Sequence, residues 1–318
     1  MASHRARRRR IRCVRRRPFL CTVLVSAVIV GGTSAGTAYV KDRARPGAGA
    51  VSSRSSTAPS APESASAGQE ASVDSASQQP SADRDALLAK AMEPVSVEHG
   101  ADVAVAVFDL DSGESATYGD GAFDTASIVK VDILAALLLQ AQDADRRLTA
   151  REKSYATAMI EDSDNASASA LWTAIGAADG LDRANKRFGL TDTAGGDGGL
   201  WGLTQTTAAD QLGLLQQVFG NDSLLSDASR AYLQKLMGNI APDQTWGVSA
   251  AADGSAWALK NGWLARSTTG LWDVNSIGWV TAGGHGYLVA TLSNGNSTME
   301  KGVSLVETAA RAAVSVFG

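Results

Sequence analysis

The sequence predicts an α+β fold in which one sheet is assembled from both ends of the folded region, with a block of helices inserted between them. Two observations carry this prediction. Strand-like segments occur early, at 103–110 and 115–118, and again late, at 257–264, 271–281 and 286–293. The residues between these two groups instead show apolar positions at helical spacing. Such an order of elements implies one sheet built from distant pieces of the chain and covered by helices.

The first 40 residues predict export. Residues 1–17 are rich in arginine, and the uncharged run 18–40 is long enough to span a bilayer. This run is either a retained membrane anchor or a cleaved signal peptide, because Gly36-Thr37-Ala38 offers small residues of the kind found at cleavage sites. Both cysteines, Cys13 and Cys21, fall in this part of the chain, so the remainder has no disulfide and no thiol nucleophile.

Residues 41–82 predict a disordered linker ahead of a folded domain at 83–318. The linker is dominated by Ser, Ala, Gly, Pro, Gln and Glu without hydrophobic periodicity, so it cannot bury enough apolar surface to fold. Charge is divided unevenly along the chain. The residues up to Arg45 hold 12 Lys and Arg and one acid, whereas the rest holds 17 basic and 32 acidic residues. An acidic folded part argues against nucleic-acid binding.

The folded domain opens with a helix and a hairpin. The segment 83–98 carries apolar residues at helical spacing. The run V-A-V-A-V-F-D-L at 103–110 is typical of a strand, and Asp-Ser-Gly-Glu at 111–114 supplies a turn before 115–118. These two strands therefore form the first part of the sheet.

The next element is a helix over 128–139, where nearly every residue is apolar and which must therefore be buried on all sides. Asp124 and Thr125 are good N-cap residues ahead of it. Lys130 interrupts the apolar run, and a buried ammonium is costly without a partner or a task. Ser127 precedes Lys130 by three residues, which places hydroxyl and amine on one helix face, as a nucleophile and its base require. The alternative is that Ser127 caps the helix and Lys130 reaches the surface.

Further helices are expected in the middle of the chain and at its end, at 148–160, 165–176, 180–188, 206–219, 228–237 and 300–317. The polar run 161–165 separates the first two of these helices, because it cannot continue an apolar face. Residues 189–203 form a glycine-rich loop that is long enough to suggest a function. Trp201 in this loop is expected to be a core or interface ring, as are Trp257, Trp263, Trp272 and Trp279. His285 is expected to be an exposed turn residue.

Three short motifs occur in order: Ser127-x-x-Lys130 at the head of the buried helix, Ser163-Asp164-Asn165 between two helices, and Lys260-Asn261-Gly262 on a strand. The set resembles the S-x-x-K, S-D-N and K-[TS]-G signature of class A β-lactamases and penicillin-binding proteins. The resemblance covers about 83–318. It implies a β-lactamase/transpeptidase-like fold, with a five-stranded antiparallel sheet flanked by helices and an inserted all-α block. Out of context, the second motif is usually a helix cap and the third a turn.

The resemblance implies a catalytic role for four residues. Ser127 would attack the substrate carbonyl with Lys130 as its base. Ser163 would pass a proton to the leaving nitrogen, with help from the ammonium of Lys260. The histidines of the domain stand in no pattern that suggests a triad, which also favours a lysine base.

The resemblance also implies substrate-binding residues. Asn165 would hold the substrate amide or the Lys130 side chain. The substrate backbone would pair with the strand that carries Asn261, Gly262 and Trp263. The N–H groups of Ser127 and Trp263 would form the oxyanion hole.

Two departures from the family pattern bear on turnover. Where class A enzymes carry a loop glutamate that activates the deacylating water, this chain has D-G-G-L-W at 197–201. Asp197 and Asp192 are the only carboxylates of the loop and are candidates for this base, although aspartate is one methylene shorter. Asn261 replaces the usual Thr or Ser, and the strand 271–281 has no arginine for a substrate carboxylate.

We therefore expect an exported serine acyl-enzyme hydrolase of the class A β-lactamase type, which acts on β-lactams through an acyl-Ser127 intermediate. The alternatives are a D-Ala-D-Ala peptidase that acts on peptidoglycan stem peptides and a non-catalytic binding protein of the same fold. No metal or organic cofactor is implied. We expect a monomer that is secreted or lies at the outer face of the cytoplasmic membrane, with membrane contact through the N-terminal segment if it stays uncleaved.

Overall fold

The computed structural model of this chain describes residues 75–254 and 256–318. The expected export segments at 1–17 and 18–40, and most of the linker at 41–82, lie outside the described residues. None of the helices within the described ranges is both long enough and apolar enough to cross a membrane.

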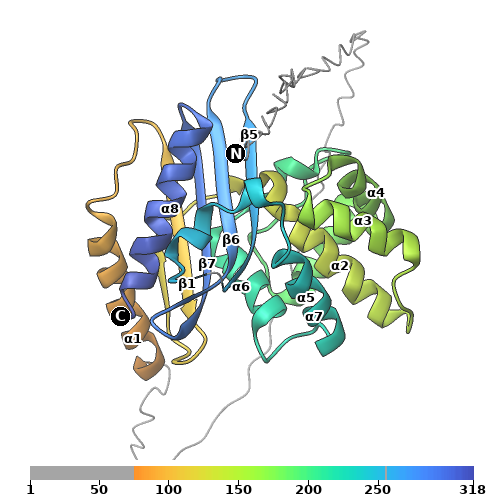
Figure 1. Ribbon diagram of the computed structural model, residues 1–318, viewed down its shortest axis with the longest axis horizontal. Helices are drawn as coiled ribbons and strands as arrows, with labels where there is room; N and C mark the ends of the chain where they lie inside the picture. The colour runs from red at the N-terminus through yellow and green to blue at the C-terminus, as the bar shows by residue number, and fades with distance from the viewer. Residues whose placement is uncertain (1–74, 255) are drawn as a thin grey trace, which may run out of the picture. The chain divides into compact units, whose positions relative to one another are not determined.

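Five strands form one antiparallel sheet in the order β2-β1-β7-β6-β5 (Figure 1). They are β1 (Asp102–Asp109), β2 (Ser115–Tyr118), β5 (Trp257–Ala265), β6 (Trp272–Ala282) and β7 (His285–Asn296). Strand β1 pairs with β7 along its whole length, from Asp102 opposite Asn294 to Asp109 opposite Tyr287. The early hairpin and the late strands therefore meet at the centre of the sheet, which confirms the predicted α+β fold.

Helices α1 (Ser75–Met92) and α8 (Met299–Ser315) lie on one side of the sheet (Figure 1). They pack on a hydrophobic cluster that includes Leu88 of α1, Val105 of β1 and Val306 of α8, all three fully buried. Neighbouring residues of β1, such as Ala104, point into a second cluster on the opposite face. Because both faces are covered, β1 is apolar at nearly every position.

The opposite side of the sheet carries the helical block, with α2 (Val129–Asp143) at its centre (Figure 1). Twelve of the 15 residues of α2 are buried, as expected for a helix without a polar face. The other helices of the block are α3 (Ala150–Glu161), α4 (Asn165–Ile175), α5 (Ala177–Phe188), α6 (Ala208–Phe219) and α7 (Asp227–Met237). Helices α6 and α7 contact the sheet, and α3, α4, α5 and α7 contact α2.

Two features differ from the sequence expectation. Helix α1 was expected over 83–98 but begins at Ser75 and ends at Met92, and Pro94 explains the early end because it disfavours helical geometry at the residue before it. A second, two-stranded sheet of β3 (Phe123–Asp124) and β4 (Gln205–Thr206) was not predicted, because strands of two residues carry no periodicity. This small sheet ties the end of the glycine-rich loop to the segment that precedes Ser127.

Candidate active site

Ser127 lies in a short 3-10 turn, Ala126–Ile128, that leads directly into α2. Ala126 has a φ of +48°, in the left-handed region that residues with a Cβ rarely adopt. A strained backbone of this kind persists only where surrounding contacts hold it, and it is common at active sites.

Thr125 stands at the N-cap position of this turn, as expected, but its side chain makes no capping hydrogen bond. The Thr125 hydroxyl is buried without a hydrogen-bond partner in the described part of the chain. Asp124 belongs to β3, and its carboxylate pairs with Arg266 and accepts a hydrogen bond from Gln205. Asn275 of β6 donates from its buried amide to the carbonyl oxygens of Asp124 (2.9 Å) and Thr125 (3.1 Å). Tertiary contacts therefore take the place of a helix cap.

Lys130 is fully buried, and its Nζ lies within hydrogen-bond distance of four oxygens: Ser127 Oγ (2.9 Å), the carbonyl (2.7 Å) and Oγ (3.0 Å) of Ser163, and Asn165 Oδ1 (2.8 Å). Burial lowers the pKa of Lys130 to about 8, against the opposing effect of the Asp164 charge. A lysine with this pKa is partly neutral at neutral pH and can accept the Ser127 proton. The side chain does not reach the surface, which was the alternative for this residue.

Ser163 lies in the loop between α3 and α4 with a φ of +56°. The neighbouring Asp164 caps α4 by accepting a hydrogen bond from the Ser167 N–H (2.6 Å). Ser163 Oγ lies between two amines, 3.0 Å from Lys130 Nζ and 3.1 Å from Lys260 Nζ. The second motif is therefore a helix cap and, at the same time, a bridge between two lysines.

Lys260 and Gly262 come from β5, which is an edge strand of the sheet. Lys260 is fully buried, and burial, together with the nearby charge of Lys130, lowers its pKa well below the ordinary value. Gly262 presses directly against the turn that carries Ser127. A Cβ on this glycine would lie 2.7 Å from both the Ser127 nitrogen and the Thr125 carbonyl oxygen. Only glycine therefore allows β5 to approach the nucleophile this closely.

Asn261, expected to contact substrate, faces its own chain instead. It is fully buried, and its Nδ2 donates to the carbonyl oxygens of Gln244 (2.7 Å) and Trp246 (3.1 Å). The side chain therefore fixes the segment before the 3-10 turn Gly247–Ala251 and is not available to a ligand. Trp263, also on β5, is partly exposed, and its ring lies 5.9 Å from that of Trp246 between centroids.

Asp197, the candidate deacylation base, is exposed, and in the described residues its carboxylate makes no hydrogen bond or ion pair with Ser127 or Lys130. The side chain of this loop that lies next to Lys130 is Trp201, whose ring centroid is 5.0 Å from Lys130 Nζ. Sequence reasoning expected only a packing ring at Trp201. The sequence feature that could have indicated a role in the site was its position in the glycine-rich loop, four residues after Asp197.

A cleft of about 580 Å³ adjoins this group of residues. It runs between the loop and the end of β5, and its lining includes Ser169, Trp201, Leu203, Leu264 and Arg266. Arg266 lies in the turn after β5 rather than on the strand 271–281, where an arginine was absent. The site therefore has an open groove on the outer side of Trp201.

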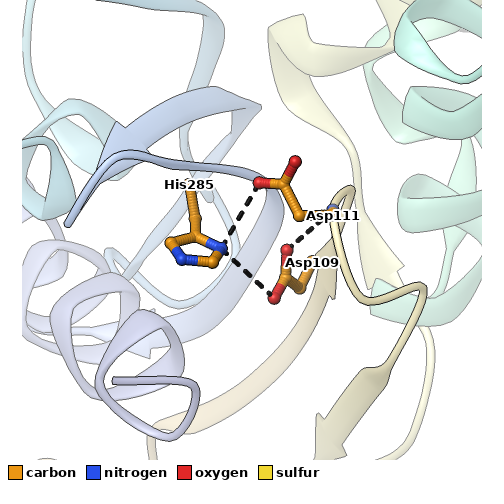
Figure 2. Close-up of side chains that lie close together, drawn as sticks. All are labelled: Asp109, Asp111 and His285. Atoms are coloured by element: carbon orange, nitrogen blue, oxygen red, sulfur yellow. Dashed lines mark hydrogen bonds and ion pairs between the residues drawn. The ribbon is translucent and has the colours of Figure 1, made fainter.

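Away from this site, one group of described side chains has the composition of metal ligands: Asp109, Asp111 and His285. Figure 2 shows His285 Nδ1 facing both carboxylates, 3.4 Å from Asp111 Oδ2 and 4.0 Å from Asp109 Oδ2. The Asp109 carboxylate accepts hydrogen bonds from the Asp111 N–H (2.9 Å) and from Ser112 Oγ (3.0 Å). These contacts close the β1–β2 turn, and His285 is an exposed residue at the start of β7.

The residues brought together can carry out an acyl transfer. Ser127 supplies a hydroxyl, and Lys130 supplies an amine of lowered pKa within hydrogen-bond distance. Ser163 and Lys260 form a second hydroxyl–amine pair that can deliver a proton to a leaving group. The edge strand β5 adds backbone groups that a peptide-like ligand can pair with.

Comparisons with known proteins agree with this description. The model of a family described as Beta-lactamase enzyme family matches residues 147–317, which is more than half of the chain. LppW of Mycobacterium tuberculosis and of Mycobacterium bovis, provisionally named as lipoproteins, are 26% identical over 172 residues, or 52% of this chain and 55% of theirs. The chain spans about half the length of these curated relatives.

Solved structures share the fold over nearly their whole length. PBP-A is 23% identical with a TM-score of 0.62, over 73% of this chain and 96% of that one. The TLA-1 extended-spectrum β-lactamase is 15% identical with a TM-score of 0.64, over 75% and 99%. A β-lactamase from Xanthomonas campestris is 20% identical with a TM-score of 0.58, over 74% and 97%. These matches confirm the predicted fold.

Proposed function

Because this chain belongs to the beta-lactamase enzyme family, we propose that it is an exported serine acyl-enzyme hydrolase whose Ser127 attacks the amide carbonyl of β-lactams. The observation that carries this proposal is the 2.9 Å contact between Ser127 Oγ and Lys130 Nζ. Burial lowers the pKa of Lys130 to about 8, so the amine can act as a base near neutral pH. No cofactor is needed for this chemistry.

Acylation transfers the Ser127 proton to Lys130 while the bond between Oγ and the carbonyl carbon forms. We assign the developing oxyanion to the N–H groups of Ser127 and Trp263. The close approach of β5 to the turn supports this assignment, since a Cβ on Gly262 would lie 2.7 Å from the Ser127 nitrogen. Donors held rigidly in a buried site are the usual source of such stabilisation.

The amide C–N bond then breaks, and the leaving nitrogen needs a proton. We assign its delivery to Ser163, whose Oγ accepts hydrogen bonds from Lys130 and Lys260 and whose own hydrogen is free to be donated. The amines on either side can replace the proton that the hydroxyl gives up. Asn165, bonded to Lys130 at 2.8 Å, holds that amine in place.

Labelling with penicillin tests the proposal. A labelled penicillin should attach to the purified domain with one label per molecule, and Ser127→Ala should abolish attachment. Ser304→Ala, which removes an exposed serine of α8, is the matched control and should label like the wild type. Equal labelling of the wild type and Ser127→Ala would refute the assignment of the nucleophile.

A peptidase that acts on peptidoglycan stem peptides is the second candidate. It is favoured by the contacts of Lys130, which in the described residues include no carboxylate that could activate water for rapid release of a β-lactam acyl group. Release of D-alanine from a model peptide, together with lasting acylation by penicillin, would support it. Fast β-lactam turnover without D-alanine release would reject it. The short contact between Ser127 and Lys130 disfavours a non-catalytic binding protein.

We also propose that the domain acts outside the cytoplasm, as a monomer, behind the N-terminal segment at 18–40. The apolar run after an arginine-rich start supports this location, as do curated relatives named as lipoproteins. Cell fractionation of the full chain, with N-terminal sequencing of the product, distinguishes a retained anchor from a cleaved signal. An intact chain in the cytosol would contradict export.

A further inference from the structure

We propose that Trp201 is a lid on the Ser127–Lys130 pair that keeps hydrolytic water away, so that the acyl-enzyme is long-lived. The inference rests on the proposed function and concerns its second step, the hydrolysis of the acyl-enzyme. It makes Trp201 the residue that decides whether bound acyl groups are retained or released.

The first support is the position of the ring. Trp201 lies over Lys130, with 5.0 Å between the ring centroid and Nζ, a distance at which an aromatic face attracts an ammonium. The indole N–H donates to Ser169 Oγ of α4 at 3.1 Å. The ring is therefore held at its face by Lys130 and at its edge by Ser169.

The second support is the anchoring of the loop. The indole N–H of Trp172, a buried residue of α4, donates to the Gly198 carbonyl at 2.8 Å. After Trp201, the Thr204 carbonyl accepts a hydrogen bond from the Thr125 N–H at 2.9 Å. The 3-10 turn Trp201–Leu203 thus contacts the 3-10 turn of Ser127, and the loop is held to α4 before Trp201 and to the segment before Ser127 after it. These hydrogen bonds hold the loop, and with it Trp201, in place over the Ser127–Lys130 pair.

The third support is that the described residues enclose Lys130, whose side chain is fully buried among them. Its donors are directed to Ser127, Ser163 and Asn165, and β5 lies against the turn at Gly262. The cleft of about 580 Å³ is lined by Trp201 and Ser169 but not by Lys130. The Trp201 ring therefore lies between this open groove and the base.

The chemistry explains why this separation matters. Deacylation requires a water oxygen to bond to the acyl carbon while the bond from that carbon to Ser127 Oγ breaks. The water gives its proton to a base, and the proton ends on Ser127 Oγ. In the described residues the amine that contacts Ser127 Oγ is Lys130, and water can use it only from a position next to Nζ, where the ring lies.

The first test compares acylation and deacylation of the same protein with a chromogenic cephalosporin. Wild type should give a burst of about one product per molecule followed by slow turnover. Trp201→Ala should keep the burst and raise the deacylation rate at least about tenfold, because it admits water to a general base. Ser169→Ala should shift the rate in the same direction by less. Trp201→Phe, which keeps a ring but lacks the N–H that donates to Ser169, should behave like Ser169→Ala. Leu200→Ala, an exposed neighbour, should resemble the wild type.

A second test does not depend on β-lactam chemistry. Isocyanic acid, formed from cyanate, adds to a neutral amine by forming an N–C bond as the amine proton moves to the reagent nitrogen. Peptide mass mapping should show faster carbamoylation of Lys130 in Trp201→Ala than in the wild type, while the exposed Lys153 reacts equally in both.

The outcomes separate the two ideas. Absence of any cephalosporin opening by the wild type, with neither a burst nor steady turnover, would refute the proposed function, and the cyanate result would then decide the lid alone. Fast steady turnover by the wild type without a burst would keep the proposed function and refute the lid. A normal burst with unchanged deacylation in Trp201→Ala would refute the lid. Unchanged carbamoylation of Lys130 in that variant would also refute it.

Discussion

Replacing Asp132 with asparagine should change the pH dependence of stability. Asp132 lies in the middle of α2, is fully buried, and neither carboxylate oxygen has a hydrogen-bond partner within normal geometry in the described part of the chain. Burial raises its pKa to about 7, and the charges of Asp182 and Asp210 act in the same direction, against an opposing effect of the Asn185 amide. This carboxyl group is therefore protonated over most of the acidic range.

Whether stability rises or falls with pH depends on which state, folded or unfolded, binds more protons. Between the ordinary pKa of 3.8 and the folded value of about 7, the folded protein binds a proton that the unfolded chain has lost. Stability therefore falls as the pH rises through this window and levels off above pH 7. Raising the pKa from 3.8 to about 7 corresponds to a loss of at most about 4 kcal/mol, of which about 2–3 kcal/mol falls between pH 5 and 8.

Urea unfolding followed by tryptophan fluorescence from pH 5 to 8 measures the effect. Asp132→Asn cannot ionise, and its stability relative to the wild type should rise by about 2–3 kcal/mol across this range. Other titrations, such as that of Lys260, cancel in the difference. Asp143→Asn on the same helix is the control, because pairing with Arg187 lowers the pKa of that exposed carboxyl and leaves it ionised throughout. Parallel stability curves for the wild type and Asp132→Asn would refute the reasoning.

Two further predictions concern the catalytic turn. The acylation rate should rise about tenfold from pH 6 to 7 and level off above pH 8, because burial lowers the pKa of Lys130 to about 8 and only the neutral amine accepts the Ser127 proton. Stopped-flow acylation measures this profile, and a flat profile would exclude Lys130 as the base. Gly262→Ala should reduce acylation at least about 100-fold, because its Cβ would lie 2.7 Å from the Ser127 nitrogen. Gly199→Ala, where a Cβ meets nothing within 4 Å, should acylate normally in the same assay.

The parts of the fold that the sequence predicted are those with a strong local pattern. The central helix has an apolar run with no polar face, and the observed α2 is buried at 12 of its 15 residues. The alternation at 103–110 predicted β1, which spans Asp102–Asp109. Each of these patterns repeats several times within one element, so neighbouring residues reinforce the same prediction.

The contacts that distinguish this site could not be read from local patterns. Trp201 reaches Lys130 across 71 positions of the sequence, and Asn275 reaches the Asp124 and Thr125 carbonyls across 151 and 150. Asn261 replaces a hydroxyl residue in the family motif, but its burial depends on where the segment at 244–246 lies. Such contacts follow from the packing of whole elements, about which a single motif carries no information.

The charge balance of the site connects its geometry to its reactivity. Lys130 and Lys260 are both fully buried and both donate to the same oxygen, Ser163 Oγ. Two buried ammonium groups this close repel each other, and no carboxylate in the described residues is hydrogen-bonded to either amine. The folded state therefore favours at least one neutral amine. The same burial that makes these lysines costly to the fold is what supplies Ser127 with a base.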